Sequence, residues 1–351
     1  MPTDAPQHAA LLVLPRLRVQ NANAISSPMT WGFPAITAFS GFMAALARRL
    51  VPDAGIQFHG VGVVCHHFEA QVTQGGYVRN FHLTRNPVLA DGSTAAIVEE
   101  GHIHLDITLV FDVSLAHHLQ DDTTRTSLAA HVGEVVAGMR LAGGSIMPPL
   151  PGTLRRAPRA QLKLLHDETD ARRAQEFRHL SRRWLPGFAL VSADEVLQRT
   201  HQDALQAQAP NGTPPPTLFD TWLDLSRINH RPVKKTVWDE AIGDYQNTVT
   251  WETDKRPGWL VPIPVGFAAL SALHPPGAVA GARDAATPFR FVECVYSMGQ
   301  WISPHRLRDT QQMMWYAEHD AESGLYRCTN GYQVPPQSQA PLSVTPPVHQ
   351  D

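Results

Sequence analysis

The sequence predicts an α+β fold, and the order of apolar patterns within residues 9–150 carries this prediction. Period-2 runs that favour strands and 3.6-period runs that favour helices follow one another in the order strand, helix, strand, strand, helix, strand. This order is ferredoxin-like, and RNA-recognition (RRM-like) folds use it. Two later changes in pattern predict a helical insertion and a further β-rich C-terminal part.

The predicted core begins with a strand at 9–20, in which Leu17 and Val19 alternate with polar residues. A loop rich in Asn and Ser follows at 21–34, and a helix with one apolar face occupies 35–50. The remaining elements are a strand at 56–65, a hairpin near 66–84 that turns at 74–76, a strand at 101–113, a helix at 123–139 with a Thr-rich cap, and a glycine turn at 141–145 leading into a short strand.

The rest of the chain changes character after residue 150. Helix patterns stand at 171–185, 193–207 and 217–227, and a weakly patterned stretch runs on to 255. β-like patterns return at 258–274 and 289–296, and the tail is rich in Pro, Gln and Ser. We predict four parts: a core at 9–150, a basic and mainly helical insertion at 151–255, a β-rich part at 256–332, and a disordered tail at 333–351.

Composition limits the function classes. The chain has 351 residues, is 43% hydrophobic and carries a formal net charge of −3, less basic than most free-standing nucleic-acid binders. Cys65, Cys294 and Cys328 lack CxxC spacing, which fits a reducing compartment. No apolar run reaches the ~18 residues of a membrane span, and no secretory signal pattern is present. We expect a cytoplasmic protein with no membrane partner.

Positive charge is concentrated in two stretches. Between Pro15 and Pro52 there are four arginines and no acidic residue. Residues 140–183 hold nine arginines and one lysine against four acidic residues, a net charge of +6. A basic face on a near-neutral chain fits a subunit that holds RNA on one side and protein partners on the other. The alternative is an ordinary solvated helix face around 171–183.

The histidines and the catalytic motifs predict no chemistry. Of the 18 histidines, His102 and His104 share a strand face, but no third ligand lies at a recognisable spacing. Adjacent residues on a strand point to opposite faces, so His66 and His67 cannot act as a pair. The glycine turn lacks the GKS or GKT ending of a P-loop. We therefore expect no metal, no cofactor and no catalytic residue.

The loop NANAISSPMTWGFP at 21–34 has the composition of a reader of single-stranded RNA. Asn21, Asn23, Ser26 and Ser27 provide uncharged donors and acceptors for base edges, and nearby aromatic rings provide faces for stacking. The alternative is that Asn and Ser make local turn bonds while the rings pack in the core.

The turn RLAGGS at 140–145 is a candidate phosphate site. Its paired glycines would let a phosphate approach bare backbone, with Arg140 as the counter-charge. The alternative is a helix C-cap in which glycine takes the left-handed conformation.

Several long blocks resemble a known family. LLVLPRLRVQNANAISSPMTWGFPAITAFSGFMAAL at 11–46 is similar to the start of the Csy-complex subunit family that caps the 5′ end of the guide RNA in type I-F CRISPR systems. The similarity continues in FHLTRNPVLADGSTAAIVEEGHIHL (81–105), MRLAGGSI (139–146), RRWLPGFALVS (182–192), RPGWLVPIPVGFAALS (256–271), TPFRFVECVYSMGQWISPHRL (287–307) and GLYR (324–327).

The resemblance implies a RAMP-superfamily protein with a ferredoxin-like core. It implies a non-catalytic subunit that binds the 5′ handle of the crRNA and pairs with the large subunit at one end of the complex, beside the first backbone subunit. Guide processing and target cleavage belong to other proteins in such systems. Target DNA next to the protospacer-adjacent motif is a further candidate partner.

Within the matching blocks we predict RNA-binding residues from their chemistry. Asn21, Asn23, Ser26 and Ser27 would read handle bases, with Trp31 or Phe33 stacking on them. Arg140, Gly143, Gly144 and Ser145 would bind phosphate. Arg79 and Arg85 would contact the guide near the backbone subunit. Further candidates for contacts with the RNA backbone or with a partner are Arg182, Arg183, His305 and Arg306.

Two other functions compete with a handle-binding scaffold. One is a RAMP endoribonuclease that cuts precursor crRNA with a histidine or arginine pair. The other is a protein–protein adaptor whose neighbours hold the RNA. Cleavage of repeat RNA by the chain alone distinguishes the first, and unchanged handle binding after substitution of Asn21 or Arg140 distinguishes the second.

Overall fold

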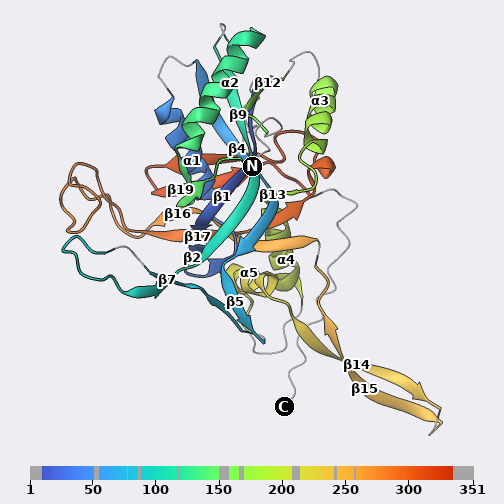
Figure 1. Cartoon of the computed structure of the whole chain (residues 1–351). Coiled ribbons are helices and arrows are strands. Elements are labelled where there is room, and N and C mark those ends of the chain that lie inside the picture. The colour runs from blue at the N-terminus through green and yellow to red at the C-terminus, as the bar shows by residue number, and fades with distance from the viewer. Residues whose placement is uncertain are drawn as a thin grey trace. The chain divides into compact units, whose positions relative to one another are not determined.

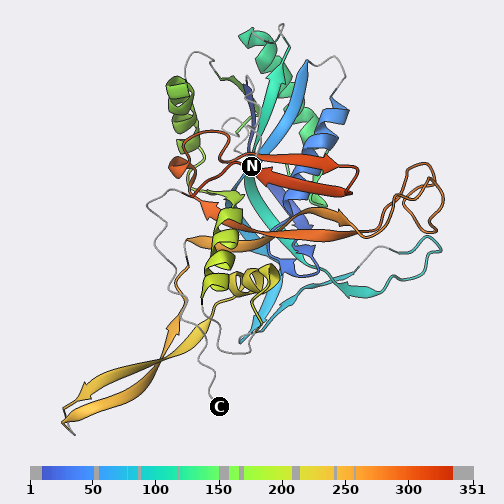
Figure 2. The ribbon, with the colours of Figure 1, turned by 180° about the vertical axis from the view of Figure 1, so that it is seen from behind.

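The structure is a computed structural model that describes residues 10–50, 55–76, 78–85, 88–116, 119, 121–149, 158–165, 170–207, 214–240, 243–256 and 258–334 (Figures 1 and 2). The chain forms two compact units. The first consists of 1–191, 263–296 and 302–332, and the second of 192–262, 297–301 and 333–351. The predicted domain boundaries stay predictions, and most of the predicted disordered tail lies outside the described residues.

The first unit is built on a large antiparallel sheet. One stretch of it runs β10-β11-β1-β9-β4-β13 and another runs β17-β16-β19-β18, while β12 pairs with β1 and β18 also pairs with β4. Its strands are β1 (Ala10–Asn23), β4 (Ile56–Ala70), β9 (His102–Leu115), β10 (Arg140–Leu141), β11 (Gly144–Ile146), β12 (Gln161–Leu164), β13 (Phe188–Ser192), β16 (Trp259–Ala269), β17 (Val292–Ile302), β18 (Trp315–Asp320) and β19 (Leu325–Asn330).

Helices lie on both faces of the central strands (Figure 1). These helices are α1 (Ile36–Arg49), α2 (Asp122–Ala137), α3 (Asp170–Arg182) and the short η3 (Pro304–Arg306). Phe42 of α1 stacks on Phe111 of β9, whereas Phe177 of α3 joins the cluster that contains Leu11 of β1. Burial on both faces explains why the start of β1 is a continuous apolar run rather than an alternating one. This sheet with packed helices is α+β, as predicted.

The two N-terminal helices begin and end close to the predicted positions. α1 buries Phe39, Met43 and Leu46 at helical spacing. Arg48 and Arg49 lie in its last turn, where positive charge interacts favourably with the negative end of the helix dipole. α2 begins one residue earlier than predicted, and its cap is not a threonine. The Asp121 carboxylate accepts a hydrogen bond from the Thr124 N–H at 2.8 Å, so Asp121 is the N-cap.

The segment that the sequence predicts as a loop contains strands, and the predicted hairpin near 66–84 is confirmed and is followed by a second hairpin. The predicted loop at 21–34 contains the end of β1 and a small hairpin of β2 (Ile25–Ser27) and β3 (Thr30–Trp31). Between β4 and β9 the chain forms two further hairpins, and the predicted turn at 74–76 joins β5 to β6. Their strands are β5 (Val72–Gly75), β6 (Val78–Phe81), β7 (Leu83–Arg85) and β8 (Ile97–Glu99). Short length and polar residues hide the apolar alternation that marks a strand in β2, β3 and β7, which the sequence did not predict.

The second unit combines two helices with a long hairpin (Figure 1). α4 (Asp194–Gln206) and α5 (Leu218–Ser226) contact each other, and a capping box between Thr217 and Asp220 fixes the start of α5. The Trp222 indole N–H donates to the Ser297 carbonyl at 3.0 Å. The weakly patterned segment before 255 is the antiparallel pair β14 (His230–Asp239) and β15 (Asp244–Thr253).

No described helix is long and apolar enough to cross a membrane. The expected cytoplasmic location stays a prediction.

Candidate nucleic-acid interface

A shallow pocket of about 310 Å³ opens where the end of β1 meets the turn between β10 and β11. We call it the amide pocket, and its walls are Asn21, Asn23, Ile25, Glu100, Gly101, His102, Ala142 and Gly143. The Asn23 N–H donates to the Ala142 carbonyl at 2.8 Å, and Gln20 of β1 pairs with Ser145 of β11. The structure therefore brings together the Asn/Ser loop and the glycine turn, which are distant in the sequence.

Asn21 sits at a bulge of β1, between the paired residues Val19 and Ala22. Its φ of 55° lies in the left-handed region, which Asn tolerates better than most residues. Its backbone N–H donates to Nδ1 of His104 at 3.1 Å. The Asn21 side chain is exposed and makes no hydrogen bond within the described part of the chain, so its amide is available to a ligand.

The glycine turn is a two-residue hairpin turn between β10 and β11. Ala142 and Gly143 have φ of 49° and 80°, and two successive positive φ values are typical of the type I′ turn that suits twisted strands. The alternative of a helix C-cap is wrong, because α2 ends at Ala137 and Gly138 provides its cap. The turn therefore projects from a hairpin and not from a helix.

Gly144 is required by packing and not by a ligand. A Cβ at this position would lie 2.7 Å from the Ala22 nitrogen and 2.7 Å from the Gln20 oxygen. Gly143, in contrast, is exposed, and a Cβ there would meet nothing within 4 Å. Of the two predicted phosphate-binding glycines, the structure leaves only Gly143 open to approach.

Arg140 lies beside the turn as the sequence predicts. Its Nε and Nη2 donate to the Gly143 carbonyl at 2.9 and 2.5 Å. Nη1 makes no hydrogen bond to the described residues, and Ser145 is exposed directly opposite Arg140 across the hairpin. One edge of the guanidinium thus holds the turn while the other remains for an anion.

The other polar residues of the Asn/Ser loop make local bonds. Asn23 bonds with the backbone of Ile25 through both ends of its side chain, at 2.8 and 2.9 Å. The Ser26 hydroxyl lies 2.8 Å from that of Thr30, and the buried Ser27 hydroxyl accepts the N–H groups of Met29 and Thr30. For these three residues the geometry supports the alternative of turn formation.

The two aromatic residues of this loop differ in exposure. Phe33 stacks on the buried Phe39 at a ring distance of 5.7 Å and therefore packs against the core. Trp31 is 51% exposed, and its ring meets Phe81 of β6 edge-on at 5.7 Å. Of the two predicted stacking residues, the structure thus presents Trp31. The same contact places the β5–β6 hairpin beside β3.

The two arginines predicted to contact the guide, Arg79 and Arg85, lie on the hairpins between β4 and β9. Arg79 of β6 is exposed, and its Nε donates to the Gln74 side chain at 3.2 Å. Arg85 lies on β7, and its side chain is outside the described set. Neither residue lines the amide pocket.

A second basic group surrounds the end of α3. Arg182 and Arg183 are exposed there, and α3 contacts η3, which carries the exposed His305 and Arg306. The adjoining pocket of about 510 Å³ is lined by Lys163, Leu164, Arg172, Gln175, Glu176, His179, Leu180 and Arg183. The structure therefore brings four more predicted residues together, but none of them lines the amide pocket.

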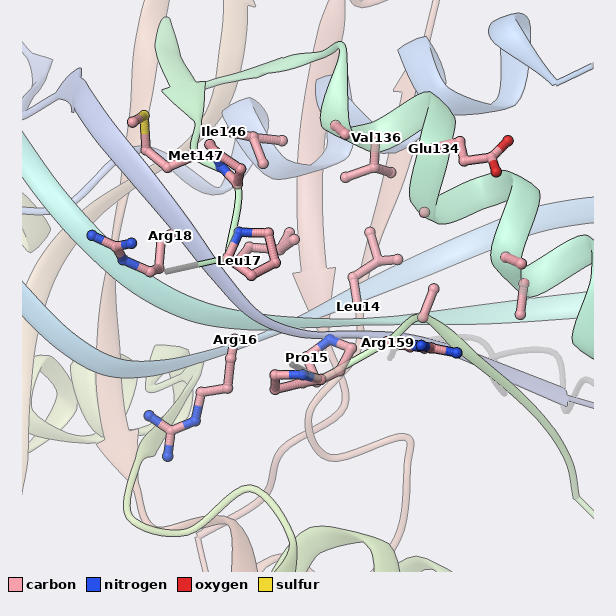
Figure 3. Close-up of a pocket in the computed structure, with 18 of the residues that line it drawn as sticks. Leu14, Pro15, Arg16, Leu17, Arg18, Glu134, Val136, Ile146, Met147 and Arg159 are labelled. Atoms are coloured by element: carbon pink, nitrogen blue, oxygen red, sulfur yellow. The ribbon is translucent and has the colours of Figure 1, made fainter. Parts of the chain in front are cut away.

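A pocket of about 720 Å³ is lined by residues outside the predicted RNA-binding set (Figure 3). Apolar side chains such as Leu14 and Val136 line it, with Arg18 and Arg159 among its charged residues. Arg16 has a φ of 53° and pairs with Asp106 at 3.1 Å. Arg16 and Arg18 belong to the acid-free stretch between Pro15 and Pro52, and Arg159 belongs to the second basic stretch, residues 140–183.

His66 is held in a neutral form. Its Nδ1 lies 2.7 Å from the Pro186 carbonyl, which can only accept, so Nδ1 carries the proton. Nε2 then accepts from the Thr108 hydroxyl at 2.7 Å. Burial, the largest effect, lowers the pKa of His66. Both ring nitrogens are engaged, so this histidine is not poised for proton transfer to a substrate.

No group of three His, Cys, Asp or Glu side chains in the described part of the chain could hold a metal ion. The three cysteines are free, and burial raises the pKa of the Cys65 thiol to about 12. Such a thiol is not a reactive nucleophile.

Fold and pocket define an α+β protein in which exposed amides and a left-handed turn surround a pocket on the large antiparallel sheet. The family model described as CRISPR-associated protein (Cas_Csy2) matches residues 12–328. The CRISPR-associated protein Csy2 of Pseudomonas aeruginosa (strain UCBPP-PA14) is 47% identical over 320 residues, which are 91% of this chain and 94% of that protein. The chain belongs to the Csy2 family of CRISPR-associated proteins, which confirms the resemblance found in the sequence.

Proposed function

We propose that this chain is a non-catalytic subunit of the type I-F CRISPR surveillance complex that binds the 5′ handle of the crRNA at the amide pocket. Membership of the Csy2 family supports a place in that complex. The observation that carries the RNA-binding role is the meeting of Asn21 with the Ala142–Gly143 turn in one pocket. In this proposal other surfaces contact the large subunit and the backbone subunits, and target DNA next to the protospacer-adjacent motif is a further candidate partner.

The proposal includes a ferredoxin-like RAMP core. Four strands are adjacent in the order β11-β1-β9-β4, with α1 between β1 and β4 in sequence and α2 between β9 and β11. In a ferredoxin-like sheet the first and third strands are central and the second and fourth flank them. The order of these four strands supports that assignment, although the sheet continues beyond β11 and β4.

The pocket offers groups suited to base edges. The free Asn21 amide both donates and accepts, and the exposed ends of bases are read by such bonds. The Glu100 carboxylate lies 3.3 Å from Nε2 of His102 and can accept from the amino group of a base. A carboxylate repels phosphate, so bases and not phosphates fit this side of the pocket.

Phosphate fits the opposite side, at the turn. Arg140 retains one free edge beside the exposed Gly143 and Ser145, which gives a charged donor next to open backbone. Trp31 presents a face on which a splayed base can stack. Asn23, Ser26 and Ser27 shape the backbone that holds these groups, which is a positioning role.

The remaining candidates have roles at a distance from the pocket. Arg182, Arg183, His305 and Arg306 form a basic surface that suits the RNA backbone or an acidic partner surface. Arg79 and Arg85, on the hairpins between β4 and β9, would meet the guide beside the backbone subunit.

The endoribonuclease alternative gains no support from His66, because this histidine is engaged at both ring nitrogens. The adaptor alternative draws on the local bonds of Asn23, Ser26 and Ser27, and handle binding decides between it and the proposal.

The deciding experiment titrates the full-length chain, purified with its co-expressed sister proteins, with handle RNA at several salt concentrations. We expect Arg140→Ala to weaken binding about 5- to 10-fold and to reduce the salt slope by about 0.7, the value for one phosphate contact on a single strand. The matched control is Arg283→Ala, which removes an exposed arginine from another loop and should change neither quantity.

Equal affinity and equal salt slope for Arg140→Ala and the native chain would support the adaptor alternative. Cleavage of repeat RNA at a fixed position by the purified chain would contradict the non-catalytic assignment.

A further inference from the structure

The β14–β15 hairpin has two faces of different chemistry. Residues directly opposite each other in an antiparallel pair share a face, and successive residues alternate between faces. The register pairs Trp238 with Tyr245, Lys234 with Val249 and Pro232 with Trp251. We call this side the aromatic face, and it consists of His230, Pro232, Lys234, Thr236, Trp238, Tyr245, Asn247, Val249, Trp251 and Thr253.

The large side chains of the aromatic face are open to solvent. Trp238 is 51% exposed, Tyr245 66% and Trp251 69%. Trp238 and Tyr245 meet edge-on at 5.1 Å, which gives one preformed aromatic pair near the tip of the hairpin. A two-stranded hairpin is only marginally stable in water, and rigid exposed Trp and Tyr side chains are the usual anchors of protein interfaces.

The opposite face is suited to water. Lys235 pairs with Glu252 there, and Arg231 pairs with Asp254 at 2.8 Å. Its other positions hold the polar residues Thr248, Thr250 and Gln246, the acidic residues Asp239 and Asp244, and two aliphatic residues, Val233 and the exposed Val237. Aromatic rings are thus concentrated on one side of the hairpin and ion pairs on the other, and an exposed apolar patch is typical of an interaction surface.

The charge pattern favours a protein over a nucleic acid as the occupant. Lys234 is the only Lys, Arg, Asp or Glu on the aromatic face. The tip beyond Trp238 carries the exposed acids Glu240 and Asp244, which would repel a phosphate backbone. Nucleic-acid surfaces draw most of their affinity from several Lys or Arg contacts to phosphate. This arrangement lacks them and instead resembles the aromatic core and charged rim of a protein interface.

We propose that the aromatic face docks onto another protein subunit of the complex, an inference that rests on the proposed function. The partner surface is an apolar groove that receives Trp238, Tyr245 and Trp251. A carboxylate in that groove faces Lys234, and basic side chains at its end face Glu240 and Asp244. This docking assigns to the hairpin a role separate from that of the amide pocket.

The test co-expresses the chain with all sister subunits and guide RNA, and measures the composition of the purified particle by native mass spectrometry. The double variant Trp238→Ser, Tyr245→Ser removes one cross-strand pair of the aromatic face. The matched control Val237→Ser, Gln246→Ser removes the neighbouring pair of the opposite face. In particles of the first variant we expect the amount of one protein subunit to fall by at least about 10-fold, as for an interface hot spot. In particles of the control we expect the amount of every subunit to stay unchanged.

A second measurement, by cross-linking, does not depend on whether the double variants fold. A photo-crosslinking amino acid replaces Thr236 on the aromatic face or Thr248 on the opposite face. Cross-linking to a protein subunit from position 236 alone supports the docking. Cross-linking to RNA or DNA from position 236, equal cross-linking from both positions, or no loss of any subunit in the aromatic variant would overturn it.

The same particles separate this inference from the proposed function. Guide RNA that stays bound in the aromatic variant while one protein is lost supports both. Handle RNA that fails to bind the native particle contradicts the proposed function, whereas the difference between the two faces in protein content still tests the docking.

Discussion

The amide pocket and the aromatic face present their chemistry in different ways. In the pocket most polar side chains are bonded locally, and Asn23, the Ala142–Gly143 turn and the neighbouring Ser27 shape the backbone. On the aromatic face the side chains themselves are exposed, and the backbone is an ordinary antiparallel ladder. Changes to the locally bonded residues and to the turn should therefore alter folding as well as binding, whereas changes to the free Asn21 amide and to the aromatic face should alter binding alone.

The largest expected effect comes from packing beneath the pocket. Gly144→Ala places a Cβ 2.7 Å from backbone atoms of β1, and we expect it to lower the free energy of unfolding by about 3 kcal/mol. The control Gly143→Ala meets open space and suffers only its positive φ, at a cost of about 1 kcal/mol. Thermal unfolding measures both. Equal losses for the two variants would show that β11 does not approach β1 as closely as described.

A smaller expected effect is the pH dependence of stability that comes from Asp112, on β9 of the sheet that carries the pocket. Burial raises the pKa of Asp112 to about 6, although the Tyr316 hydroxyl donates to its carboxylate at 2.8 Å. The folded state thus binds this proton more tightly than the unfolded state, and stability falls as pH rises from about 4 to about 6.

Asp112→Asn removes the cost of burying a charged carboxylate at this position. We expect the variant to be more stable than the native chain by about 2 kcal/mol at pH 7.5, and the difference to shrink as pH falls below 6. Unfolding temperatures measured across this pH range test the sign. A variant that is less stable than the native chain at pH 7.5 would contradict it.

The sequence predicted the elements that bury a face against the core. The spacing of Phe39, Met43 and Leu46 predicted α1, and the apolar run of β1 predicted a strand. It could not predict β14 and β15, because neither face of that hairpin is buried and the alternation of apolar and polar residues is therefore weak. It missed β2 and β3 because their serines form the turn bonds that the pattern attributed to a loop.

The sequence predicted the two segments that form the candidate site, but it could not predict that they lie next to each other. The composition of 21–34 and the glycine pair each indicated a binding segment. Their meeting depends on the pairing of β1 with β11, which is a property of the sheet. The inward position of Ser27 and the packing role of Gly144 likewise depend on neighbours that are distant in the sequence or set by the turn.

The most direct measurement compares the affinity of the native chain and of Asn21→Gly for handle RNA and for a scrambled RNA of the same length. Glycine keeps the positive φ of position 21, so the unfolding temperature should not change, while the free amide is lost. The account predicts affinity for the handle about 5-fold weaker and almost unchanged affinity for the scrambled RNA, as for one lost hydrogen bond to a base. Unchanged affinity for the handle would contradict the claim that this pocket reads it.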